Sequence, residues 1–219
     1  MTPLKSLFQK WKQKIDSQHL DNKKKHDYAK TISTVSQVVG SAGNNEERIH
    51  ILDYAINVIG RELAYSAAAE LLHFGNTPED REYIIPLGSK TWKSNQQFSL
   101  AGANIVSDTY DLDKLRKAIP QVFTNGFHQE LGNYTGTYYP EINLVIVENG
   151  RHHLSAAMTK NLGSAMLYVH SLKEAFPHMK TDGAYWYIDG MKPWTVYDYR
   201  VATLYELARM KDLFSHDNC

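Results

Sequence analysis

Cysteine is almost absent from this sequence of 219 residues: the single one, Cys219, is the last residue. One cysteine excludes an internal disulfide bond and any cysteine-rich metal site. The sequence also lacks an apolar run of about 18–20 residues, the length that spans a bilayer, and an apolar signal-peptide core near its start. These absences predict a cytoplasmic protein without a transmembrane segment.

Net charge is absent as well, because 24 lysine and arginine residues balance 24 aspartate and glutamate residues. A protein that is held on DNA by charge alone is usually more basic than this. The balance is uneven along the chain, because residues 1–30 contain eight lysines and three aspartates, a net charge of +5 that leaves −5 for the rest. Positive charge is therefore concentrated at the start of the sequence.

Residues 3–16 have the pattern of a basic amphipathic helix. Its apolar residues recur at helical spacing between the lysines, and they are Leu4, Leu7, Phe8, Trp11 and Ile15. We favour a helix whose apolar stripe packs on the body of the protein and whose lysines are solvated. The alternative is an arm that binds a membrane surface or nucleic acid.

The rest of the first third is also largely helical in pattern. Residues 18–25 are polar and lysine-rich and predict a loop, while residues 28–39 predict a helix that ends at Gly40. Residues 45–74 predict the strongest helix of the chain, with a stop at Gly75.

The pattern changes to alternating strands and helices after Pro78. Apolar segments predict strands at residues 83–87, 142–147, 165–170 and 185–188, and periodic segments predict helices at 112–123, 154–161 and 197–214. We therefore expect an α+β fold, in which a helical N-terminal region (1–78) precedes a small mixed-sheet α/β domain with a C-terminal helix (79–219). Two acidic residues near that last helix, Asp198 and Glu206, are interpreted as solvated.

The residues Asn149-Gly150-Arg151-His152-His153 join the most strongly predicted strand to a short helix. A glycine in such a turn lets the backbone approach a ligand closely, and the first N–H groups of a helix attract anions. Arg151 can hold a phosphate through two parallel hydrogen bonds. His152 or His153 can transfer a proton near neutral pH. The turn predicts a phosphate-binding site, with a solvated polar helix cap as the alternative.

Residues 142–157 resemble the signature of the ParB-like/sulfiredoxin-like superfamily. That signature is an apolar strand, an Asp/Asn-Gly turn and a His/Arg pair that leads into a Leu-x-Ala-Ala helix. Residues 84–87, 112–126 and 160–170 follow the order of the neighbouring elements in that superfamily. The resemblance extends over residues 82–190 and implies a small mixed-sheet domain that binds phosphates of a nucleotide or of nucleic acid.

The resemblance also implies roles for individual residues. It assigns phosphate binding to the turn and to a polar stretch after the first strand that faces the same cleft, and these residues are Asn149, Gly150, Arg151, His152, His153, Lys93 and Asn95. Sulfiredoxins have a catalytic cysteine where this chain has Arg151, so sulfiredoxin chemistry is excluded. The superfamily usually ends the pair with arginine, where this chain has His153. No helix-turn-helix pair of the kind that partition-type ParB proteins use follows the domain.

Three functions are consistent with these features. The leading hypothesis is a nuclease or nucleotide hydrolase, in which Arg151 stabilises negative charge, His152 or otherwise His153 is the acid or base, and Mg²⁺ binds together with a nucleotide. The second is a non-catalytic module that binds nucleotide or DNA phosphates and docks a protein partner through its N-terminal helices. The third is a peripheral membrane or scaffold protein that uses residues 3–16.

No cluster of neighbouring residues predicts a metal site of the protein's own. The histidines lack the i, i+4 spacing of a helical metal-binding pair. A divalent metal site would require the fold to bring acidic residues together, from among Glu82, Asp108, Glu148 and Asp189.

Overall fold

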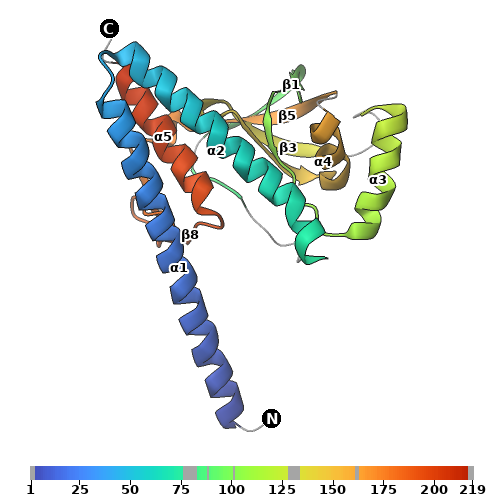
Figure 1. Ribbon diagram of the computed structural model, residues 1–219, viewed down its shortest axis with the longest axis horizontal. Helices are drawn as coiled ribbons and strands as arrows, with labels where there is room; N and C mark the ends of the chain where they lie inside the picture. Colours follow the sequence, from blue (N-terminus) through green and yellow to red (C-terminus); the bar gives the residue numbers. More distant parts are fainter. Residues whose placement is uncertain are drawn as a thin grey trace.

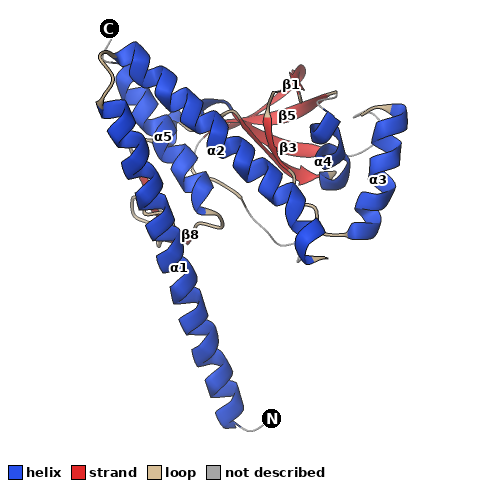
Figure 2. Cartoon of the chain, in the orientation of Figure 1, coloured by secondary structure: helices blue, strands red, loops and turns tan. Residues whose placement is uncertain are grey.

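The computed structural model describes residues 3–75, 83–87, 89–100, 102–127, 134–160 and 163–216, and within these ranges the side chains of all but residues 3–15 and 89–97. The fold is α+β, as the sequence predicts. Three long helices lie side by side and flank a mixed sheet (Figures 1 and 2). These helices are α1 (Pro3–Gly40), α2 (Asn45–Phe74) and the C-terminal α5 (Tyr199–His216).

The main sheet has five strands in the order β1-β5-β3-β4-β2. They are β1 (Ser89–Ser99), β2 (Asn104–Val106), β3 (Thr135–Tyr139), β4 (Leu144–Asn149) and β5 (Ser164–Ser171). The pairs β2–β4 and β3–β5 are parallel, and the pairs β1–β5 and β3–β4 are antiparallel. The sheet is therefore mixed, and β4 lies between a parallel and an antiparallel neighbour.

The remaining elements surround this sheet. They are the helices α3 (Leu112–Asn125) and α4 (Arg151–Lys160), the 3₁₀ turns η2 (Pro140–Ile142) and η3 (Lys173–Ala175), and a small antiparallel sheet of β6 (Met179–Thr181), β7 (Tyr185–Ile188) and β8 (Trp194–Thr195).

Strand β4 is buried on both faces of the sheet. Leu144 and Ile146 belong to the hydrophobic cluster that includes most of the buried residues of α2 and α5, whereas Val145 and Val147 belong to the cluster under α3 and α4. A strand that is covered on both faces has a continuous apolar sequence rather than an alternating one. This explains why the segment 142–147 is the clearest strand signal in the sequence.

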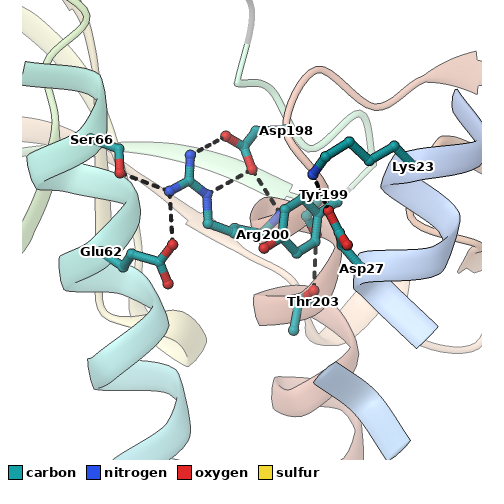
Figure 3. A network of polar contacts seen from close by, with 8 residues as sticks. All are labelled: Lys23, Asp27, Glu62, Ser66, Asp198, Tyr199, Arg200 and Thr203. Carbon is teal, nitrogen blue, oxygen red and sulfur yellow. Dashed lines mark hydrogen bonds and ion pairs between the residues drawn. The ribbon is translucent and has the colours of Figure 1, made fainter. Parts of the chain in front are cut away.

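The helix α2 links the two predicted regions of the chain. It packs against α5 and against β2, and Gly60 allows the close approach to β2, because a Cβ there would lie 2.5 Å from Asn104 Nδ2. A polar network around Arg200 at the start of α5 adds a second link, through Ser66 and Glu62 of α2 (Figure 3). The helical third and the sheet therefore share one core.

The predicted loop at residues 18–25 is wrong. The structure has one unbroken helix, α1, across this segment. No proline or glycine interrupts residues 4–39, and lysine is a good helix former, so a polar composition does not break the helix. Lys23 and Asp27 also form an i, i+4 ion pair, a contact that stabilises helices.

The predicted strand at residues 83–87 is also wrong, because these residues form no ladder. Tyr83 and Ile85 are buried in the core, which explains their apolar character without a strand. The strand β1 follows directly after them, in a polar segment that the sequence pattern does not identify as a strand.

The other predicted elements are confirmed within a few residues, including α2, α3, α4, α5 and the strands β4, β5 and β7. In the part of the chain that the structure describes, no helix is long and apolar enough to cross a membrane.

Candidate phosphate-binding site

A pocket of about 410 Å³ lies beside the first turns of α3 and α4. The parallel neighbours β2 and β4 lead directly into these two helices, so both helices begin at the same edge of the sheet. The crevice outside the carboxyl ends of parallel strands is a common ligand site in open α/β sheets. The residues that line it are Tyr110, Lys114, Lys117, Gln121, Glu148, Asn149, Gly150, Arg151, His152 and His153.

The predicted turn forms one wall of this pocket. Gly150 has a φ of 80°, in the left-handed region that favours glycine, and its N–H donates to Asn149 Oδ1 at 2.9 Å. The carbonyl of Gly150 accepts the N–H of Leu154 at 3.1 Å and so begins α4. The Ser107 hydroxyl donates to the carbonyl of Arg151. These contacts fix the start of α4 against the segment that follows β2.

Three cationic side chains line the pocket, two from α3 and one from α4. Lys114 and Lys117 are three residues apart and therefore lie on one side of α3. The ring of Tyr110 lies between the helices: the Lys114 ammonium is 4.6 Å and the Arg151 guanidinium 5.9 Å from its centroid. Glu148 is the one carboxylate among the lining residues. The lining therefore has an excess of positive charge.

His152 connects the starts of the two helices. Its Nε2 accepts the backbone N–H of Asp111 at 3.3 Å, and its ring packs edge-on against Tyr110 at 4.9 Å. Asp111 in turn caps α3, because its Oδ1 accepts the N–H of Lys114 at 3.0 Å. Burial, and then the charge of Lys114, lower the pKa of His152 below its ordinary value. Its neutral form is therefore favoured, with the proton on Nδ1.

His153 also lines the pocket, so both histidines of the turn lie beside it. Its Nε2 lies 2.9 Å from Gln121 Oε1 on α3, to which it donates. Its ring lies 5.7 Å from that of Tyr134, and burial lowers its pKa. Through Nε2, His152 holds α4 against Asp111, the residue that caps α3. His153 holds α4 against α3 itself through Gln121. This geometry suits positioning groups better than a freely exchanging acid or base.

We expect the protein to lose stability as the pH falls below the value of 6.5 and through the lower folded pKa of His152. The folded pKa of His152 is below the value of 6.5 in an unfolded chain, so the unfolded state binds more protons in this range. The stability contributed by the neutral ring is complete above 6.5 and is lost as the pH falls through the folded pKa. His152→Gln, which has no titrating group, should reduce this loss in urea unfolding titrations. His26→Gln, the same substitution at an exposed position, is the matched control.

The prediction also includes Lys93 and Asn95, whose side chains are outside the described residues. Their strand β1 forms the sheet edge opposite to β2. Three residues that line the pocket are not predicted from the sequence, namely Tyr110, Lys114 and Lys117. Their only local signal is the Lys114–Lys117 spacing directly after the helix cap at Asp111.

Of the acidic candidates that the structure describes, Glu148 alone lines the pocket. Asp108 is buried at 3% exposure, and Asp189 pairs with His178. Glu82 lies outside the described residues. Within the described ranges, no group of three or more histidine, cysteine or acidic residues could hold a metal ion. A single carboxylate among three cations does not fit a divalent ion held by the protein itself.

Comparison with known proteins assigns the chain to a family. A model of a family of unknown function, DUF6710, matches residues 11–216, and the chain therefore belongs to that family. No curated protein matches the sequence. No solved structure matches it either.

Proposed function

We propose that this member of DUF6710 binds a phosphate group of a nucleotide or of nucleic acid in the pocket between α3 and α4. The observation that carries the proposal is the convergence of Lys114 and Lys117 with Arg151 at the first turn of α4. Basic side chains and helix N-termini both attract anions, and together they suit a doubly charged phosphate. The volume of about 410 Å³ is within the ordinary range of small-molecule sites.

The sequence resemblance supports the same proposal. In the ParB-like/sulfiredoxin-like superfamily, the turn after the apolar strand and the start of the next helix bind phosphates. Here the corresponding residues 149–153 form one wall of the pocket. Membership of that superfamily is itself part of the proposal.

We expect Arg151→Ala to weaken binding of the phosphate ligand by about 1.5–3 kcal/mol, roughly 10- to 150-fold in Kd, because a charge-assisted hydrogen bond has this strength. Isothermal titration with AMP, ATP and a 5′-phosphorylated oligonucleotide measures it. Arg116→Ala is the matched control. Arg116 is also a cation of the α3–α4 region, but it pairs with Asp113 in solvent and does not line the pocket.

If wild type and Arg151→Ala bind every ligand with equal affinity, the turn is not the phosphate site. A thermal-shift panel of the same ligands, with and without Mg²⁺, identifies which of them binds the folded state, since such a ligand raises the melting temperature. No shift and no heat with any of them would contradict the proposal.

A hydrolase is the second candidate, and Glu148 is the observation that favours it. This carboxylate lines the pocket together with Arg151, and its Oε1 accepts the hydroxyl of Thr137 at 2.9 Å. A carboxylate in this position can accept a proton from an attacking water molecule. Product formation from DNA, RNA or nucleoside triphosphates that is lost in both Glu148→Gln and His152→Ala would support hydrolysis. Binding without turnover by the wild type would favour the non-catalytic module.

A further inference from the structure

The first part of α1 projects beyond the body of the protein (Figure 1). Asp21 contacts the body, since its carboxylate accepts the hydroxyl of Tyr185 at 2.5 Å. Lys24 then donates to the carbonyl of Val196 at 2.8 Å, and Lys25 pairs with Asp182 at 2.8 Å. By contrast, residues 16–20 are all exposed. We call residues 3–20 the arm.

The arm has an amphipathic sequence on a helical backbone. At about 100° per residue, the positions of Leu4, Leu7, Phe8, Trp11 and Ile15 fall on one face of the helix. Because α1 is one continuous helix, the same register continues into the body. The body-contacting positions 21, 24, 25 and 28 are centred roughly 105° around the helix from this apolar face. The apolar face of the arm therefore differs from the face that contacts the body.

The charge of the arm indicates what covers its apolar face. Residues 3–15 contain four lysines, Lys5, Lys10, Lys12 and Lys14, and no acidic residue. Since the whole chain has no net charge, the remaining residues together carry −4. Two arms packed face to face would bring like charges together, which disfavours a second copy as the partner. Nucleic acid would satisfy the lysines but not the apolar face.

We infer that the arm binds the surface of an anionic lipid bilayer. A helix with leucine, phenylalanine and tryptophan on one face and lysines beside it is suited to the membrane interface, where the apolar face enters the headgroup boundary and the lysines meet anionic lipids. Tryptophan is favoured at this depth because its ring is apolar and its N–H is polar. The net negative charge of the rest of the protein keeps the body away from the lipid surface. This inference is independent of the phosphate pocket.

The test is co-sedimentation of the full chain with vesicles of phosphatidylcholine, alone or mixed with phosphatidylserine. We expect binding that requires phosphatidylserine and weakens as salt is added, because surface charges are screened. Trp11→Ala and the double variant Lys10→Glu/Lys14→Glu should each reduce the apparent affinity by at least about tenfold. The matched control is Lys180→Glu/Lys192→Glu, which makes the same charge change at exposed positions of the body and should bind as the wild type does.

Three outcomes would overturn the inference. The first is no binding to vesicles that contain phosphatidylserine. The second is vesicle binding that Trp11→Ala and Lys10→Glu/Lys14→Glu leave unchanged. The third is a dimer or an oligonucleotide complex that the arm variants abolish while vesicle binding remains absent. Every variant should melt at the same temperature as the wild type in circular dichroism. A loss of binding then reflects the arm and not the fold.

Discussion

Replacing Gly150 by alanine is expected to lower the free energy of unfolding by about 2–4 kcal/mol and to weaken phosphate binding. Two costs combine at this position. The backbone has a φ of 80°, which disfavours any residue with a Cβ, and that Cβ would lie 1.9 Å from Cδ1 of Tyr134. Tyr134 packs against Phe127 at 5.1 Å and lies beside His153, so its ring cannot move without disturbing the start of α4. Urea unfolding and nucleotide titration measure the two effects.

The chain provides a matched control for the backbone cost. Gly190 has a φ of 74°, and a Cβ there would meet no atom within 4 Å. Gly190→Ala should therefore cost only about 1–2 kcal/mol and leave ligand binding unchanged. Adding Tyr134→Ala to Gly150→Ala should recover the steric part of the loss. If Gly150→Ala costs no more than Gly190→Ala, the contact with Tyr134 does not constrain the turn.

The part of the site that the sequence predicts is the part that is contiguous in the chain. Asn149, Gly150 and Arg151 stand together between a strand and a helix, and local turn chemistry suffices to recognise them. Lys114 and Lys117 join them only because β2 pairs in parallel with β4. Parallel pairing of two strands separated by a helix and by β3 leaves no local pattern. The pocket therefore combines residues from two separate segments, and the sheet topology brings these segments together.

The distinction between local and long-range signals also explains which elements of the fold are predictable from the sequence. Helix α2 is predictable because its signals are local: Asn44 accepts the N–H of Glu47 at its start, and Gly75 ends it. The segment 83–87 has an apolar pattern, but Tyr83 and Ile85 are buried in the hydrophobic cluster without forming a ladder. Burial alone does not distinguish a strand from an irregular buried segment.

Charged residues near α5 show a third limit of prediction from sequence, which concerns the burial of ion pairs. The interpretation of Asp198 and Glu206 as solvated is wrong: the side chains are 14% and 15% exposed, and they pair with Arg200 and Arg209. An acidic residue beside an arginine in sequence does not reveal whether the pair lies in solvent. That depends on the elements that pack beside it, as Ser66 and Glu62 of α2 do beside Arg200.

Removing the guanidinium of Arg200 is expected to destabilise the protein by about 3–5 kcal/mol, because it leaves a largely buried carboxylate without its partner. Arg200 donates to both oxygens of Asp198, at 2.9 and 2.6 Å, and to the hydroxyl of Ser66 at 2.8 Å (Figure 3). Its side chain is 16% exposed. Burial acts to lower the pKa of Arg200, but the hydrogen bonds and charge of Asp198 outweigh it and raise the pKa.

Arg200→Met keeps most of the aliphatic side chain and removes the charge, so urea unfolding of this variant isolates the polar network. Asp198 also accepts the backbone N–H of Arg200 at 2.9 Å and thereby caps α5, a role that asparagine preserves. Arg200→Met combined with Asp198→Asn should therefore recover much of the loss, since no buried charge is left unpaired. Arg116→Met is the control: its pair with Asp113 is 74% and 83% exposed, and it should cost less than about 1 kcal/mol. A similar small cost for Arg200→Met would mean that water, and not Arg200, satisfies Asp198 at the junction of α2 and α5.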